Sequence, residues 1–349
     1  MTFAAEQCSQ LPERDMRARC QTGIGHILVC LDRSALSEAC LPHAVAMAAV
    51  FDARMTLLHV MQGPHDGGPQ PTPDPLGWEI ARQEAQAYLE RLKDRTLALG
   101  PVTRTLLAQG HPAARIASVA AEIGADLTVL GSHGEGGHVN GLGSTVQQVL
   151  AITRSSVFVA RSTATTPAPI TPKRILVPLD GSTRTECVLP MAARIARTHG
   201  AELLLVHVVS EPVPSTILSA GEDLELARDL ARRLQSGAER YLNQIASQLR
   251  LESLGVRTVV LRETDARQSL VELSEREHVD LMIVAAHGST CNPARAFGTV
   301  ASYLLSHARP ALLVIQDLRA PERETADDDL DERHAAPIRG TPHTGPEAT

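Results

Sequence analysis

Two stretches of the chain have the residue types of a phosphate-binding loop. Their small residues are Gly131, Gly134, Gly143 and Ser144 in the first stretch and Gly288, Gly298 and Thr299 in the second. Glycine lets a backbone turn with positive φ and approach a phosphate closely. A helix that follows such a loop directs free N–H groups and the positive end of its dipole at the anion. The chemistry that these residues indicate is anion binding.

Hydroxyl side chains come directly before both expected helices. We expect the helices to begin near Thr145 and Val300, with Ser144 and Thr299 as their N-caps. The two hydroxyls could cap the helix, contact a phosphate, or do both. Arg295, inside the second loop, could add a phosphate contact or lie in solvent.

Asp32 and Asp180 each follow an apolar run that reads as a strand. A carboxylate at the end of a strand can accept hydrogen bonds from a nucleoside, or it can serve as a turn residue that opens the next helix. Position alone leaves these two interpretations equal.

Histidines occur in two settings. His59 and His207 lie inside apolar strands, and we expect them to be hydrogen-bonded core residues; His133 and His287 lie in the glycine loops, where they could contact a nucleotide or pack the loop. No nucleophile turn with Ser-His-Asp or Cys-His order and no Walker loop is present. The sequence therefore indicates binding rather than dedicated catalysis.

The candidate residues belong to an internal repeat. Four blocks recur in the same order. The first three recur at an offset of 148 and the fourth at 154, so the two copies differ in length by six residues between the third and fourth blocks. The pairs are His26–Ser34 with Arg174–Ser182, Leu41-Pro42 with Leu189-Pro190, Leu57–Val60 with Leu205–Val208, and Ala125–Gly134 with Val279–Gly288. Duplication of one domain explains this pattern.

Each copy alternates short apolar runs with amphipathic stretches, which is typical of βαβ units. Ile27–Leu31 and Ile175–Leu179 suit strands buried on both faces. Apolar residues at helical spacing follow Val188, and Thr183 with Glu186 has the spacing of a capping box for that helix. The fold class is α/β: two tandem doubly wound, Rossmann-like domains, each with a five-stranded parallel sheet and a crevice at the carboxyl ends of its strands.

The expected organisation is an N-terminal extension (1–21), domain 1 (22–163), a Pro- and Thr-rich linker (164–173), domain 2 (174–317) and a disordered acidic tail (318–349). A net charge of −7 argues against nucleic acid as a partner. No signal peptide or membrane span is recognisable, so we expect a soluble, cytoplasmic protein. Its six cysteines lack metal or disulfide spacing and are interpreted as unpaired thiols.

On these blocks and loops the chain resembles the universal stress protein family over about residues 22–163 and 170–317. ATP-binding members of that family carry a glycine, two residues, a glycine, nine residues, and a glycine followed by Ser or Thr. The first copy has only eight residues between Gly134 and Gly143, and the second copy has Ala285 in place of the first glycine. The intact spacing favours the second copy as the better site.

The resemblance implies a regulatory module of the stress response that binds ATP with Mg²⁺, with slow ATP hydrolysis left open. It places Asp32 and Asp180 near the adenine and ribose, and the backbone of Val60 and Val208 against the adenine. It also implies an unidentified protein partner and dimerisation through the last strand of the sheet.

Here Val157–Ala160 and Leu312–Ile315 could pair within one chain as a pseudo-dimer, with further self-association left open. Two other functions compete with ATP binding. One is an interaction scaffold that has lost the nucleotide. The other is an enzyme that forms adenylated intermediates, which is disfavoured because Asp32-Arg33-Ser34 and Asp180-Gly181-Ser182 replace the expected Ser-Gly-Gly loop.

Overall fold

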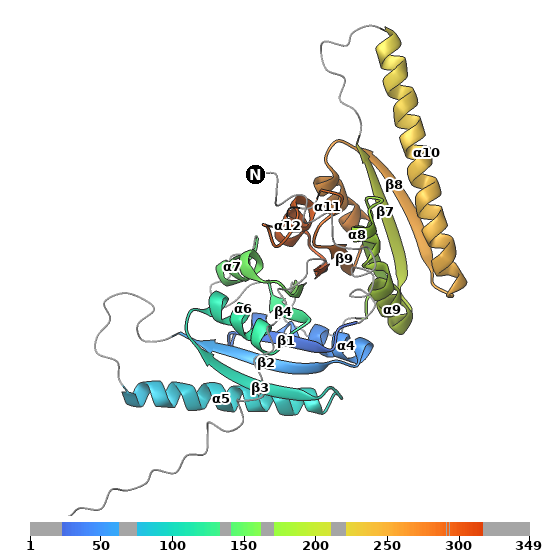
Figure 1. Cartoon of the computed structure of the whole chain (residues 1–349). Helices are drawn as coiled ribbons and strands as arrows, with labels where there is room; N and C mark the ends of the chain where they lie inside the picture. The colour runs from blue at the N-terminus through green and yellow to red at the C-terminus, as the bar shows by residue number, and fades with distance from the viewer. Residues whose placement is uncertain are drawn as a thin grey trace, which may run out of the picture. The chain divides into compact units, whose positions relative to one another are not determined.

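Strands and helices alternate along both copies of the repeat (Figure 1). The computed structural model describes residues 23–62, 75–132, 141–161, 171–210, 221–290, 292 and 294–316. The first copy contains β1 (His26–Leu31), α3 (Ala35–Glu38), α4 (Leu41–Phe51), β2 (Arg54–Met61), α5 (Pro75–Leu97), β3 (Thr103–Gln109), α6 (Pro112–Glu122), β4 (Leu127–Gly131), α7 (Ser144–Ile152) and β5 (Ser156–Ala160). The second contains β6 (Arg174–Pro178), α8 (Thr183–Glu186), α9 (Leu189–His199), β7 (Glu202–Ser210), α10 (Gly221–Leu251), β8 (Val256–Glu263), α11 (Ala266–Arg276), β9 (Leu281–Ala285), α12 (Thr299–His307) and β10 (Ala311–Ile315).

The described strands form one sheet in the order β3-β2-β1-β4-β5-β10-β9-β6-β7-β8. Within each copy every pairing is parallel, and β1 lies between β2 and β4 just as β6 lies between β7 and β9. Each copy is therefore a doubly wound domain with five parallel strands, as the sequence predicted. The strand order reverses between β1 and β4 and between β6 and β9, and these are the positions where open α/β sheets bind ligands.

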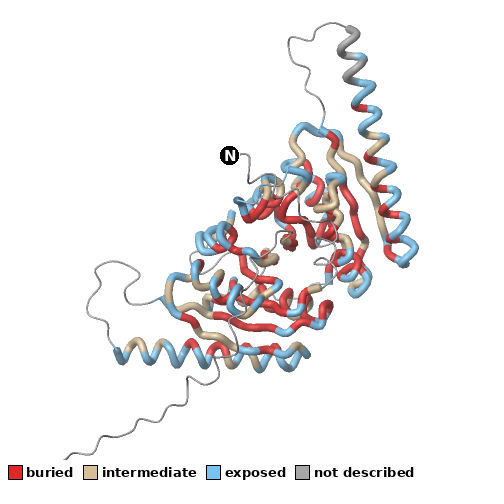
Figure 2. Tube along the Cα trace, in the orientation of Figure 1, coloured by how far each residue is buried: buried red, intermediate tan, exposed pale blue. Residues whose placement is uncertain are grey.

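The central strands are buried because helices cover both faces of the sheet. All six residues of β1 are buried, as are all five of β4 and of β9. Residues of α4, α5, α9 and α10 pack in the core on one face, and residues of α6, α7, α11 and α12 pack on the other. Figure 2 shows the buried strands between helices whose outer faces are exposed. This covering explains the continuous apolar runs in the sequence.

The two copies join through their last strands. β5 and β10 pair antiparallel, with Leu312 opposite Val159 and Val314 opposite Val157. The prediction that these segments pair within one chain is confirmed. The pairing covers two sheet edges that would otherwise expose unpaired N–H and C=O groups.

The helix expected from Thr183 onward is in fact two helices. α8 ends at Glu186 and α9 begins at Leu189, with Pro190 in its first turn. The capping residue of α8 is Ser182, whose hydroxyl accepts from the Thr185 N–H at 3.4 Å. The capping box proposed for Thr183 and Glu186 is thus wrong by one residue, because Thr183 already has helical geometry.

Several sequence expectations fall outside the described residues. They include the N-terminal extension, the tail beyond 317, most of the linker, Cys8, Cys20 and Cys291. Of the six cysteines, Cys30, Cys40 and Cys187 are described, and each is buried and outside any disulfide. Among the described helices, none is long and apolar enough to cross a membrane.

His43 of α4 is a buried ionisable residue of the core. Its side chain is 5% exposed, and its ring centroid lies 5.0 Å from that of Phe158 in β5. Burial lowers the pKa of His43 to about 4, because the low-polarity surroundings disfavour the imidazolium. In the unfolded chain the same histidine has a pKa of about 6.5.

Acidification should therefore destabilise the protein. Between about pH 6.5 and pH 4 the unfolded chain binds a proton at His43 that the folded chain excludes, which removes up to about 3 kcal/mol of stability. Urea unfolding at several pH values would measure this loss. His43→Leu should reduce the pH dependence of the unfolding free energy. The contributions of His26 and His199, whose pKa values burial also lowers, should remain in the variant. An unchanged pH dependence in the variant would contradict the assignment.

Candidate functional site

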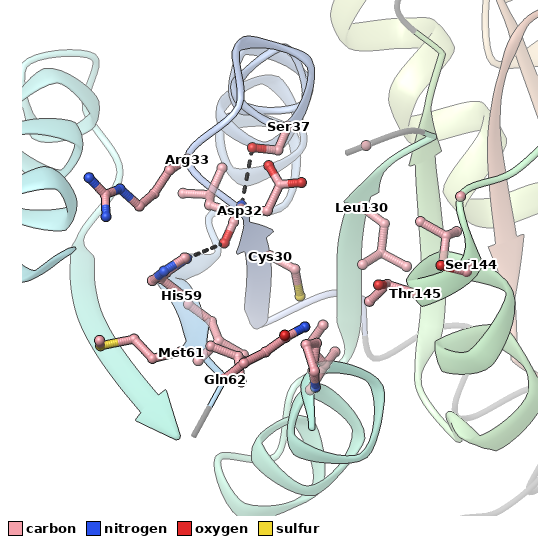
Figure 3. A pocket seen from close by; sticks show the side chains of 18 of the residues that line it. Cys30, Asp32, Arg33, Ser37, His59, Met61, Gln62, Leu130, Ser144 and Thr145 are labelled. Atoms are coloured by element: carbon pink, nitrogen blue, oxygen red, sulfur yellow. Dashed lines mark hydrogen bonds between the residues drawn. The ribbon is translucent and has the colours of Figure 1, made fainter. Parts of the chain in front are cut away.

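A cavity of about 670 Å³ opens at the strand-order reversal of the first copy. It is lined by the ends of β1, β2 and β4 and by the first turn of α7 (Figure 3). The sequence-predicted residues that line the cavity are Asp32, Val60, Gly131, Gly143 and Ser144. The structure thus brings these five together. Gly134, the other candidate of this copy, lies outside the described residues.

Asp32 is held by a tight turn after β1. Its Oδ1 accepts hydrogen bonds from the Ser34 N–H at 3.0 Å and the Ser34 hydroxyl at 2.6 Å. Arg33 between them has a φ of 71°, and Ser34 caps α3. Asp32 is therefore both a turn residue and a cavity-lining residue, since the turn fixes its carboxylate on the cavity wall.

The glycine loops of the two copies are closed at both ends by equivalent hydrogen bonds. In the first copy Ser132 donates its N–H to Ala160 O at 2.9 Å, and Gly143 donates to Ser132 O at 2.9 Å. In the second copy Ala286 donates to Ile315 O at 2.8 Å, and Gly298 donates to Ala286 O at 2.7 Å. The one-residue difference in loop length is accommodated between these anchors, so it leaves the start of the following helix unchanged.

The helices after the loops begin one residue earlier than predicted. The N-caps are Gly143 and Gly298, and Ser144 and Thr299 are the first helical residues. Neither helix has a side-chain cap. The hydroxyl-cap prediction is wrong, because the glycine at each position takes the extended conformation that ends the loop. The first N–H groups of α7 remain without a capping side chain, and Gly143, Ser144, Thr145 and Val146 line the cavity.

The equivalent cavity of the second copy is much smaller, about 210 Å³. It is lined by all the candidates of that copy, namely Asp180, Val208, Ala285, Gly288, Gly298, Thr299 and Val300. Ligand sites for molecules of drug size commonly measure about 300–1,000 Å³. The first cavity falls inside that range and the second falls below it, whereas loop spacing in the sequence favours the second copy.

Asp180 closes the second cleft against its own glycine loop. Its Oδ1 accepts from the Ser182 hydroxyl at 2.5 Å and the Thr185 hydroxyl at 2.8 Å, and its Oδ2 accepts from the Ser289 N–H at 2.7 Å. Burial alone would raise the pKa of Asp180, but these hydrogen bonds outweigh burial and hold the pKa below its usual range. Both oxygens of this carboxylate therefore already have partners in the chain.

The strand histidines are hydrogen-bonded, as predicted, but they are half-buried rather than core residues, and His59 lines the first cavity. The Nδ1 atoms of His59 and His207 each lie 2.8 Å from the carbonyl oxygen at the corresponding position, Leu31 and Leu179. His287 is 1% exposed and its Nε2 lies 3.0 Å from Arg295 O, so it packs the second loop. Arg295 itself is exposed. His133 lies outside the described residues.

Sequence reasoning missed two kinds of site residue. Ser37 and Thr185 hold the aspartate turns: each hydroxyl lies 3.2 Å from the aspartate N–H five residues earlier. Their matching positions in the repeat were the available signal. Trp78 of α5, the single tryptophan of the chain, also lines the first cavity. No motif in the sequence marked Trp78, which α5, the element after β2, brings to the cleft.

The fold and the cleft together define a class of protein: tandem doubly wound α/β domains with a glycine loop at the strand-order reversal. The sequence profile of the universal stress protein family matches residues 23–161 and 171–316. The chain therefore belongs to the universal stress protein family, as its resemblance indicated.

Relatives of similar length support this assignment. Universal stress protein Rv2005c of Mycobacterium tuberculosis is 27% identical over 300 residues, which cover 82% of this chain and 96% of the relative. A universal stress protein structure from Archaeoglobus fulgidus has a TM-score of 0.61 at 16% identity and covers 84% of this chain and 97% of its own. A putative universal stress protein from Pseudomonas aeruginosa has a TM-score of 0.56 at 18% identity, covering 86% and 94%. The two structures share the fold.

Gly288 should tolerate no side chain, because a Cβ there would lie 2.5 Å from Asp180 Oδ2. We expect Gly288→Ala to destabilise the protein by about 1–3 kcal/mol in urea unfolding, since the loop or the carboxylate must move. Gly237→Ala is the matched control: Gly237 lies inside α10 with no atom within 4 Å of the added Cβ. The control should stabilise by about 0.5–1 kcal/mol. Equal effects of the two changes would refute the close approach.

Proposed function

We propose that this protein is an ATP-binding regulatory module of the stress response, with the nucleotide in the cleft of the first copy. The observation that carries the proposal is the cavity of about 670 Å³ at the strand-order reversal, with the uncapped start of α7 on its wall. A helix start supplies N–H donors and a positive dipole end for phosphates. Occupancy of the cleft would then alter which protein partner the surface recruits.

The chain's own residues divide the ligand between them. Gly131, Gly143 and Ser144 form the phosphate side of the cleft, and Asp32 and Val60 form the side expected to meet ribose and adenine. Among the described residues no group of three His, Cys, Asp or Glu could hold a metal ion. Magnesium would accordingly enter bound to the phosphates of ATP, as it commonly does in nucleotide sites.

The second copy supports a competing function, a scaffold that works without nucleotide. Its cleft measures about 210 Å³, less than the volume of the first cleft. In addition, Ala285 places a methyl group at the end of β9, where the first copy has Gly131. We therefore assign ATP to the first copy and a structural role to the second cleft.

Trp78 allows a direct test, because it is the only tryptophan and lines the cleft. We expect its fluorescence to change saturably when nucleotide-free protein is titrated with ATP and Mg²⁺. Calorimetry should give the same affinity and one site per chain. In Trp78→Phe the fluorescence signal should vanish while the heat of ATP binding persists. This control distinguishes the loss of the fluorescent probe from the loss of ATP binding.

Two aspartate variants assign the copy. Asp32→Ala should weaken ATP at least about tenfold, since hydrogen bonds to a charged group contribute on the order of 1.5–3 kcal/mol. Asp180→Ala should leave the affinity within about twofold, and so should the exposed Asp229→Ala. A loss of ATP affinity in Asp180→Ala would instead assign the ATP site to the second copy. Absence of heat and of a fluorescence change at millimolar ATP would reject ATP binding and favour the scaffold.

A further inference from the structure

A groove outside both clefts differs sharply between the two copies. In the second copy it is a cavity of about 670 Å³ between α8, the start of α9, and α10. Ten residues line it, among them Glu186, Leu189, Tyr241, Gln244, Ile245 and Gln248. Glu186 is the only charged residue of the ten. None of the ten belongs to the ATP cleft proposed above.

The repeat gives this groove an internal reference. Tyr88 of α5 and Tyr241 of α10 occupy equivalent positions, because each sets its ring edge-on to the matching strand histidine, with centroid distances of 6.5 and 6.1 Å. This match aligns α5 with α10 at an offset of 153, and α3 aligns with α8 at 148. Glu38 then corresponds to Glu186, while Arg33, Arg91 and Arg95 correspond to Gly181, Gln244 and Gln248.

In the first copy, the chain spans the groove with its own arginines. Arg95 pairs with Glu38 at 3.4 Å, and Arg33 pairs with Glu84 at 3.4 Å. In the second copy, the residue that corresponds to Glu84 is Gly237. Of the charged groups that bridge the groove, only the carboxylate of Glu186 is retained. The second copy thus lacks these guanidinium groups but has the acid that receives one in the first copy.

Glu186 is presented in a way that suits such a ligand. The Tyr241 hydroxyl donates to its Oε1 at 3.0 Å, and the other oxygen, Oε2, has no hydrogen-bond partner among the described residues. Burial and the neighbouring carboxylate raise the pKa of Tyr241, so the phenol keeps its proton and remains a donor to Glu186. Glu186 is only partly exposed. An opposite charge is therefore worth more to it than to a fully solvated acid.

We infer that this groove binds an arginine side chain of a partner protein, in the place where the first copy uses its own Arg95. The planar guanidinium would pair with Glu186, and it carries further N–H donors for amide oxygens such as those of Gln244 and Gln248. The methylene stem would cover the apolar wall formed by Leu189, Pro190 and Ile245. Nucleotide is not required for this interaction.

The three tyrosines of the chain provide the measurement. Protein labelled with 3-fluorotyrosine has one ¹⁹F resonance each for Tyr88, Tyr241 and Tyr303. Titration of the nucleotide-free full chain with N-acetyl-arginine N-methylamide should shift the Tyr241 resonance saturably and leave Tyr88 in place. The citrulline analogue, which has the same shape without the charge, should produce no shift. The lysine analogue should bind more weakly, because it lacks the planar fork.

Two variants and one control connect the shift to the groove. Glu186→Gln should weaken the arginine probe at least about tenfold, since it removes a charge-assisted pair. Gln248→Arg, which restores the residue type of the first copy, should also abolish the response by filling the groove from within the chain. Glu38→Gln, the matched change in the first copy, should leave the affinity unaltered.

The proposal fails if citrulline shifts Tyr241 as arginine does, if Tyr88 responds equally, or if neither groove variant changes the affinity. A response that appears only after residues 318–349 are removed would also overturn it, because the chain itself would then cover the groove. All of these outcomes are read without ATP, so they are independent of the result in the nucleotide cleft.

Discussion

The antiparallel pairing of β5 with β10 is the constraint on which both clefts depend. The first residue of each glycine loop, which follows β4 or β9, is hydrogen-bonded to one of these strands: Ser132 donates to Ala160 O, and Ala286 donates to Ile315 O. The residue after each strand then reaches its own glycine loop: Arg161 donates to Gly141 O at 3.4 Å, and Gln316 donates to Ala296 O at 3.1 Å. The same two residues contact the other copy, since Arg161 donates to Leu305 O and the Gln316 N–H donates to the Ser156 hydroxyl. The strands that join the copies therefore also position their loops.

Much of this fold could be predicted because its local signals agree with its global arrangement. The apolar run of β1 predicts a strand buried on both faces, and the repeat predicts that β6 does the same. Helix starts were harder. Ser and Thr suit both the N-cap and the first helical position, so the sequence could not distinguish Ser144 as a cap from Ser144 after a cap. The non-helical backbone of Gly143 decides the matter, and this residue also donates its N–H to Ser132 O, a contact across the loop.

The clefts show a different limit. Residue types and glycine spacing identified the residues that line both clefts, but they did not predict the difference in cleft volume. Cleft volume depends on contacts between residues far apart in sequence, such as Asp180 with Ser289, which are 109 positions apart. The one-residue difference in loop length, by contrast, does not change where the following helix begins, because both ends of the loop are held by hydrogen bonds.

The two copies differ at two places on the same fold, the cleft and the outer groove, and the copy with the more open cavity is a different one at each place. The first copy has the larger cleft and spans its outer groove with ion pairs; the second has the smaller cleft and an open groove beside Glu186. Exposed ion pairs such as those in the first copy contribute little to stability, so their loss from the second copy costs the fold little. The two halves can thus differ in cleft volume and in a set of surface arginines while they share one sheet. The second half instead has a recess with one carboxylate, Glu186. In the first half the corresponding carboxylate, Glu38, is paired with Arg95.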